Sequence, residues 1–113
     1  MSFKRWGYQF DGAYNFSSML SAKAGVYIIW CKKENGWKIL DVGESINVTE
    51  SIENHEKKEL WKQNCRGTIL YSASYISNEN ERRKLEAKIR TTEILICGET
   101  SKTTKRRKRN GFD

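Results

Sequence analysis

Four side chains in this sequence of 113 residues stand out as candidate acids, bases or oxygen ligands. Tyr27 stands in the apolar run GVYIIWCKK, Asp41 stands in WKILDVG, Glu86 follows a leucine, and His55 is the only histidine. Structural interpretations exist beside the chemical ones. Tyr27 fits a core aromatic with its hydroxyl at the edge, and His55 fits a histidine that satisfies the last carbonyls of a helix.

The surroundings of Glu86 leave two interpretations open. Arg82 and Arg90 stand four residues before and after it, and this spacing allows ion pairs along one helix face without any metal. A carboxylate is also a good ligand for a hard cation. The spacing alone does not separate a surface ion pair from a site.

The elements that must position these residues form a small α+β pattern. Runs rich in β-branched and aromatic residues predict three strands, and the first is apolar on both faces, as expected for a strand that is covered on both sides. Asn47 and Asn78, each three residues before a glutamate, predict helix starts. The order β-β-α-β-α predicts a small antiparallel three-stranded sheet flanked by helices. The predicted strands cover 25–33, 37–43 and 68–76, and the helices cover 48–55 and 81–92.

The turn between the first two strands decides whether Tyr27 and Asp41 share a face. A two-residue loop at Asn35 and Gly36 would put them on opposite faces. A three-residue loop over 34–36, closed by Gly36 in the left-handed conformation, makes them diagonal neighbours on one face. Their Cβ atoms are then about 7–8 Å apart. The sequence favours the three-residue loop.

Four segments in this order resemble the motifs of the GIY-YIG nuclease superfamily. Gly25-Val26-Tyr27 is similar to the first motif, and Asp41-Val42-Gly43-Glu44-Ser45 to the second. The helix up to His55 resembles the one that carries an arginine in the family, and residues 81–90 resemble the helix of its R-x-x-L-E-x-x-I pattern. The resemblance covers residues 24–98.

The resemblance implies cleavage of DNA phosphodiester bonds with a divalent metal, magnesium or manganese, held by Glu86. The resemblance also implies that Tyr27 activates or positions the attacking water. His55 positions the scissile phosphate or stabilises the charge that develops on it. A hard cation favours carboxylate oxygen and polarises a phosphoryl oxygen, so these roles are chemically consistent.

Two departures from the family pattern bear on activity. Asp41 replaces a tyrosine, and it either becomes a second metal ligand or makes a structural hydrogen bond. Ser51 replaces the arginine that stabilises the phosphate, and it precedes His55 by one helix turn, on the same face. Serine supplies no charge, and losing such a contact typically costs 10²–10³ in rate. Arg66 or Arg83 could replace the missing charge in a fully active enzyme.

The predicted site is one shallow cleft on one face of the sheet. Tyr27, Ser51, His55 and Glu86 surround it, and Asp41 lies at its edge. The resulting hypothesis is a DNA-binding GIY-YIG-like domain whose metal-dependent cleavage is weak or lost. The alternative is a non-enzymatic nucleic-acid-binding or protein-interaction module on the same fold.

The formal net charge is +7, and residues 101–113 hold six basic residues and one acid. This segment is interpreted as a flexible basic tail that neutralises phosphates. A solvated tail that aids solubility is the alternative, or, in a eukaryotic chain, a nuclear localisation signal. The candidate nucleic-acid-binding residues are Lys57, Lys58, Arg66, Arg82, Arg83 and Arg90 in the body, and Lys105, Arg106, Arg107, Lys108 and Arg109 in the tail.

The remaining features predict one intracellular domain over residues 1–100. Residues 1–24 are expected to be a lead-in that packs on a core over 25–98. The sequence has no run of about 18–20 apolar residues and no apolar stretch of a signal peptide near its start, so we expect a cytoplasmic protein without membrane contact. The three cysteines lack CxxC spacing and are expected to be reduced thiols.

Overall fold

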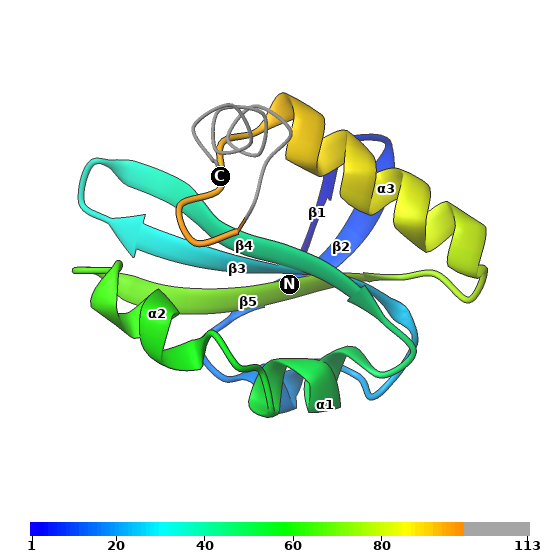
Figure 1. The fold of residues 1–113 in the computed structure, drawn as a ribbon, viewed down its shortest axis with the longest axis horizontal. Helices are drawn as coiled ribbons and strands as arrows, with labels where there is room; N and C mark the ends of the chain where they lie inside the picture. The colour runs from blue at the N-terminus through cyan, green and yellow to red at the C-terminus, as the bar shows by residue number, and fades with distance from the viewer. Residues whose placement is uncertain (99–113) are drawn as a thin grey trace, which may run out of the picture.

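The computed structural model describes residues 1–98 as an α+β fold with one antiparallel sheet between helices (Figure 1). The five strands lie side by side in the order β1-β2-β5-β3-β4. Within residues 1–98, the strands are β1 Ser2–Arg5, β2 Tyr8–Tyr14, β3 Gly25–Lys33, β4 Gly36–Ser45 and β5 Thr68–Tyr75, and the helices are the 3-10 turn Ser17–Met19, α1 Val48–Glu53, α2 Lys58–Gln63 and α3 Glu79–Thr92. None of these helices is long and apolar enough to cross a bilayer.

Helices cover both faces of the sheet, so the fold has two apolar layers. On one face α3 packs through Leu85 and Ile89, and on the other α1 and α2 pack through Ile52 and Trp61. Figure 1 shows α3 on one side of the strands and the two short helices on the other. The predicted caps are confirmed, because the Asn47 and Asn78 side chains accept hydrogen bonds at the starts of α1 and α3.

The expectation of three strands is wrong. Residues 1–24 contain β1 and β2, which extend the sheet beyond β5. Trp6 and Gly7 connect the two strands, and their φ angles of 54° and 83° are those of a type I′ turn. Phe10 is fully buried between the layers. The turn escapes sequence reasoning because Trp-Gly replaces the Asn-Gly or Asp-Gly that usually signals it.

The predicted three-residue loop between β3 and β4 is also wrong. Lys33 pairs with Gly36, so the loop has two residues. Farther along, Ile29 pairs with Asp41 while Trp30 pairs with Ile39, and Leu40 is left as an extra residue in a bulge. The bulge restores the predicted register, in which Tyr27 lies opposite Gly43 and shares a face with Asp41.

The segment after α3 runs along the outer edge of β4. Leu95 forms a parallel bridge with Ile39, and the backbone N–H groups of Cys97 and Gly98 both donate to the Leu40 carbonyl. Leu95 is buried, whereas its neighbours Ile94 and Ile96 are exposed. This pairing brings Gly98 against the side chain of Asp41.

Cys31 and Cys65 form a disulfide, so the expectation of three reduced thiols is wrong for these two. The fold places the end of β3 beside the chain that leaves α2, and the two Cα atoms lie 5.6 Å apart. Cys97 is the remaining thiol of the chain, and it is partly buried.

We expect alkylation to count one thiol in the unreduced protein. Iodoacetamide added under denaturing conditions without reductant should modify Cys97 alone, because the other two sulfurs are bonded to each other. Reduction should raise the count to three, as measured by intact mass. The Cys97→Ser variant is the control and should take no label before reduction. Two or more labels on the unreduced wild-type protein would mean that the disulfide is absent.

Candidate functional site

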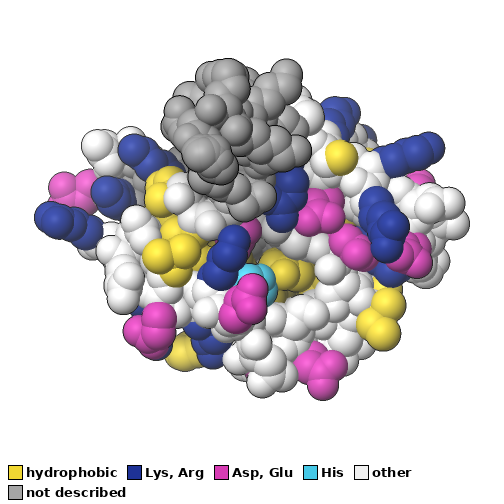
Figure 2. Space-filling model, in the orientation of Figure 1, with side chains coloured by type: hydrophobic (Ala, Val, Ile, Leu, Met, Phe, Trp, Pro, Cys, Tyr) yellow, Lys and Arg dark blue, Asp and Glu magenta, His cyan; other side chains and the backbone are white. Residues whose placement is uncertain are grey.

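Three of the predicted site residues lie around one hollow beside α1. Tyr27, Ser51 and His55 line this hollow of about 510 Å³, together with Glu50, Asn54 and Glu56. Figure 2 shows the single histidine near the middle of this face, next to an acidic and a basic side chain and to apolar atoms. The structure therefore brings together residues from β3 and from the helical segment that follows β4.

Tyr27 reaches this hollow because its strand partner has no side chain. Its ring lies across Gly43, where a Cβ atom would collide with the Tyr27 hydroxyl. Burial raises the pKa of Tyr27 to about 12, and the negative charges of Asp41 and Glu86 add to this shift. The phenol therefore keeps its proton at neutral pH and can donate a hydrogen bond, so positioning a water suits it better than acting as a base.

His55 is held between two aromatic rings. Its ring centroid lies 6.2 Å from that of Tyr27 and 4.6 Å from that of Trp61. The Nδ1 atom accepts a hydrogen bond of 3.0 Å from the Lys57 backbone N–H, so a neutral imidazole carries its proton on Nε2. Burial lowers the pKa of His55, and the charge of Asp41 only partly opposes this. His55 is thus a neutral donor at physiological pH.

We expect acid to destabilise the fold through His55. Its pKa is lower in the folded chain than the ordinary value of 6.5, so the unfolded chain binds the proton more readily as the pH falls below 6.5. Stability is therefore fully present above pH 6.5 and is lost below it. The free energy of unfolding should change with pH by less than ~1.4 kcal/mol per pH unit, which is the slope for uptake of one full proton on unfolding, because the ring is partly exposed.

Urea unfolding of the wild-type protein and of His55→Gln between pH 5.5 and 7.5 measures this effect. The variant should lose the slope, because His55 is the only histidine in the chain. Equal slopes for the two proteins would mean that the proton binds elsewhere.

Asp41 is buried and does not line the hollow, which corrects its predicted placement at the edge. Its side chain is buried, and both oxygens accept hydrogen bonds: Oδ1 from the Val42 backbone N–H at 2.9 Å and Oδ2 from the Trp61 indole at 3.0 Å. These bonds favour the structural interpretation of Asp41 over a metal ligand. Through Trp61, Asp41 supports the ring against which His55 packs.

Because Ser51 stands where the resembling family has an arginine, this position supplies no positive charge to the lining of the hollow. Its hydroxyl donates to the Ser45 hydroxyl at 2.5 Å. Glu50 and Glu56 belong to the lining, and no described Lys or Arg does. Neither arginine suggested as a replacement comes near, because Arg83 pairs with Glu79 on α3 and Arg66 lies in a different hollow.

Glu86 stands apart from this hollow, at the outer edge of β4. It belongs to α3, which packs on the opposite face of the sheet, and it does not line the hollow. Arg90 donates to its Oε2 at 3.0 Å and to the Val42 carbonyl at 2.9 Å, which fixes both side chains at the strand edge. The charge of Glu86 still reaches Tyr27 and raises its pKa. Tyr27, Ser51 and His55 therefore share one hollow, whereas Glu86 lies apart from it at the edge of β4.

The oxygen atoms of the Glu86 carboxylate fit a single contact to a hydrated cation. Its Oε2 accepts from Arg90, whereas its Oε1 accepts no hydrogen bond from residues 1–98. No group of three or more histidine, cysteine or acidic side chains gathers into a metal site within these residues. Magnesium keeps most of its ligands as water, so one carboxylate oxygen suffices for a weak site. The Arg90 guanidinium opposes it by repulsion.

The predicted nucleic-acid-binding residues do not form one surface. Arg82 is buried against Glu44, which corrects its assignment as a phosphate contact. Lys57 donates to the Cys97 carbonyl, and Lys58 donates to the Glu53 carbonyl. Arg83 is exposed on α3, and the five tail residues lie outside the described part of the chain.

Sequence reasoning missed the role of Trp61 in supporting the site. Trp61 is fully buried, donates to Asp41 and packs against His55. Arg90 has two predictions from the sequence, a phosphate contact and an ion pair with Glu86 at four-residue spacing, and the structure confirms the ion pair.

Comparisons with protein-family models, with curated proteins and with solved structures find no match for this chain.

Proposed function

We propose that this chain is a DNA-binding, nuclease-like domain whose metal-dependent phosphodiester cleavage is weak or lost. The observation that carries the proposal is the placement of Tyr27. Its hydroxyl lies over Gly43, and its ring lies next to that of His55. The charge of Glu86 also acts on this phenol and raises its pKa. A phenol donor, a neutral imidazole donor and a carboxylate around one strand edge are suited to orient a water and a phosphate.

Each residue has a role in this proposal. Glu86 would hold a magnesium or manganese ion through Oε1, and the chemistry supplied by such an ion would be polarisation of a phosphoryl oxygen. Tyr27 donates from its hydroxyl to the attacking water and positions it. His55 donates from Nε2 to a phosphate oxygen, because its Nδ1 is engaged by the backbone of Lys57.

Two observations support weak cleavage. Arg90 pairs with Glu86, so its positive charge lies beside the one carboxylate available for the metal. The hollow beside His55 is lined by two glutamates and by no described cation, and this arrangement repels a phosphate. The same observations favour the second candidate, a binding module on this fold without catalysis.

Binding to DNA rests on charge in the sequence. The chain carries +7, and most of the excess lies in residues 101–113. Such a segment neutralises phosphates without reading bases, so we expect affinity that falls steeply with salt and depends little on sequence. A cytoplasmic location stays a prediction, and the Cys31–Cys65 disulfide weighs against a strongly reducing compartment.

A plasmid nicking assay with magnesium or manganese tests the proposal. We expect slow nicking by the wild-type protein and a loss of about 10²-fold or more in Glu86→Gln, because the metal contact is removed. Tyr27→Phe should lower the rate and leave duplex binding unchanged. Glu81→Gln, an exposed change on the same helix, is the matched control.

The outcomes separate the two candidates. Equal nicking by the wild-type protein and Glu86→Gln would exclude cleavage by this site and leave the non-enzymatic binding module. A protein that neither nicks nor binds duplex DNA at low salt would overturn the proposal and leave a protein-interaction role.

A further inference from the structure

An aromatic hollow lies on the α3 side of the sheet, away from Tyr27 and His55. Its volume is about 600 Å³, and its walls include Phe3, Trp30 and Trp37. Trp30 is buried and its indole donates to Ser72, so this ring is fixed. Trp37 packs edge to face on Trp30 at 5.7 Å and is 48% exposed, so it offers a ring to solvent. The hollow therefore combines a rigid aromatic floor with an accessible aromatic wall.

Basic side chains surround this hollow. The Lys32 ammonium lies 5.5 Å from the centre of the Trp37 ring. The Arg5 guanidinium lies over Trp6 and 5.8 Å from Trp30, and it also pairs with Glu93 at 3.4 Å. The rim is thus cationic, although Arg5 is partly neutralised.

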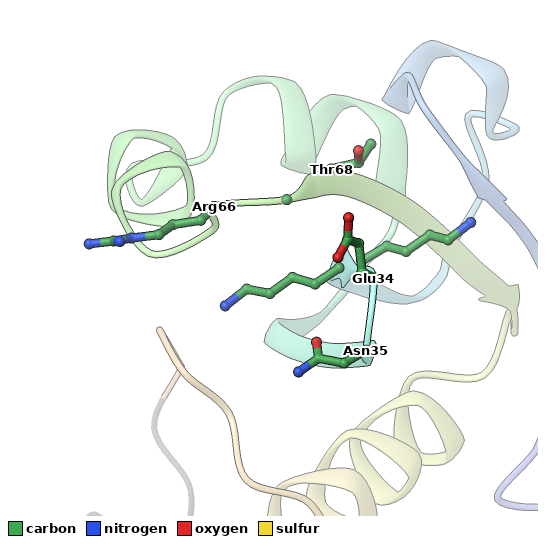
Figure 3. Close-up of a pocket in the computed structure, with 7 residues that line it drawn as sticks. Glu34, Asn35, Arg66 and Thr68 are labelled. Carbon is green, nitrogen blue, oxygen red and sulfur yellow. The ribbon is translucent and has the colours of Figure 1, made fainter.

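A second, basic hollow lies at the tip of the β3–β4 hairpin. Lys32, Lys33 and Arg66 line it, with Glu34 as the single acidic residue of the lining. Figure 3 shows Glu34 pointing from the hairpin loop toward Thr68, and Arg66 extending outward from the start of β5. Lys32 lines this hollow, and its ammonium group also lies over Trp37 of the first one, so this contact links the two neighbouring hollows.

We propose that this surface, defined by Phe3, Trp30, Trp37, Lys32, Lys33 and Arg66, binds single-stranded nucleic acid. An unpaired base stacks on Trp37 in the aromatic hollow, and the neighbouring phosphates contact the cations of the hairpin tip. Flat aromatic rings beside a basic groove are the features that such ligands require. The inference goes beyond the proposed function and does not depend on cleavage.

The charge and the rings together select this ligand over others. Duplex DNA keeps its bases stacked inside and would use only the cations. An apolar peptide would use the rings and leave three positive charges without partners. A single strand alone supplies both unpaired rings and phosphates.

Fluorescence anisotropy of labelled dT15, rU15 and a 15-base-pair duplex at 150 mM salt tests the inference on the full chain. Trp37→Ala should weaken binding of a single strand about tenfold or more, as expected for the loss of one stacked base, and should change duplex binding less than twofold. Trp37→Phe should stay within about threefold of the wild-type protein, because a flat ring remains. Phe16→Ala removes a ring that is more exposed than Trp37 and lies outside this surface, and it should change nothing.

Several results would overturn the inference. One is that Trp37→Ala, shown to be folded by circular dichroism, weakens single-strand and duplex binding equally or affects neither. If that variant does not fold, photo-crosslinking of 5-bromouracil-substituted dT15 to the wild-type protein decides. Crosslinks at Phe3 or Trp37 support the surface, and crosslinks confined to other residues exclude it. Absence of nicking would leave these results untouched, and loss of single-strand binding would leave the nicking experiment untouched.

Discussion

Arg82→Met is expected to lower the free energy of unfolding by about 3 kcal/mol or more. Arg82 is 4% exposed, and its Nε donates to Glu44 at 2.8 Å. Its Nη1 donates to the carbonyls of Ile76 and Ser77, so the guanidinium joins the end of β4 to the segment between β5 and α3. Methionine keeps the apolar bulk but leaves Glu44 and two carbonyls without a donor. Removing one partner of a buried ion pair typically costs 3–5 kcal/mol, and the partial exposure of Glu44 favours the lower end.

The neighbouring arginine provides the matched control. Arg83 is exposed and pairs with Glu79 one helix turn away, and such pairs contribute about 0.3–0.5 kcal/mol. Urea unfolding of the wild-type protein, Arg82→Met and Arg83→Met compares the two positions in one experiment. A loss of less than 1 kcal/mol in Arg82→Met would mean that this arginine is hydrated and available to a ligand, as the sequence suggested.

The features that the sequence predicted well are those with local causes. The seven buried residues at the start of β3 form one uninterrupted apolar run, and this pattern is readable without any knowledge of the fold. The caps Asn47 and Asn78 act on backbone groups three residues ahead, so a short window contains the whole signal.

The features that it missed have causes that are distant in the chain. The burial of Arg82 depends on Glu44, which lies 38 residues away. The Cys31–Cys65 disulfide depends on how α2 returns to the end of β3. The bulge at Leu40 has no local marker, yet it alone keeps Asp41 on the same face as Tyr27 once the loop is one residue shorter than predicted.

The candidate site combines both kinds of feature. Tyr27 and Gly43 face each other because of strand register, which matches the predicted register only because the bulge at Leu40 compensates for the shorter loop. The separation of Glu86 from the hollow could not, because it follows from α3 packing on the opposite face of the sheet. Whether a carboxylate and a phenol meet across a strand edge is decided by tertiary packing.

Ser51→Arg is expected to raise metal-dependent nicking by about 10²-fold if the rest of the site is competent. Ser51 lines the hollow with Tyr27 and His55, although α1 ends at Glu53, before the histidine. Two glutamates and no described cation share that lining, so a phosphate now meets net negative charge. A guanidinium supplies both a positive charge and a planar pair of donors that match phosphate oxygens.

Three further variants test the cause of any increase in the nicking rate of Ser51→Arg. Glu53→Gln makes the same change in net charge on α1 but outside the lining, and it should leave the rate within about twofold of the parent rate. Ser51→Lys should recover only part of the gain, because an ammonium lacks the planar fork of arginine. Ser51→Arg with Glu86→Gln should lose the gain if the metal contact at Glu86 is needed.

The glutamates of the hollow offer the new arginine a competing partner. In Ser51→Arg, an ion pair with Glu50 or Glu56 would hold the guanidinium away from a phosphate. Changing both glutamates to glutamine in that variant removes the competition and should raise the rate further. If nicking at saturating metal stays at the parent level in both variants, Ser51 is not the limiting defect. The Arg90–Glu86 ion pair, which lies on the other side of β4, would then be the feature that prevents cleavage.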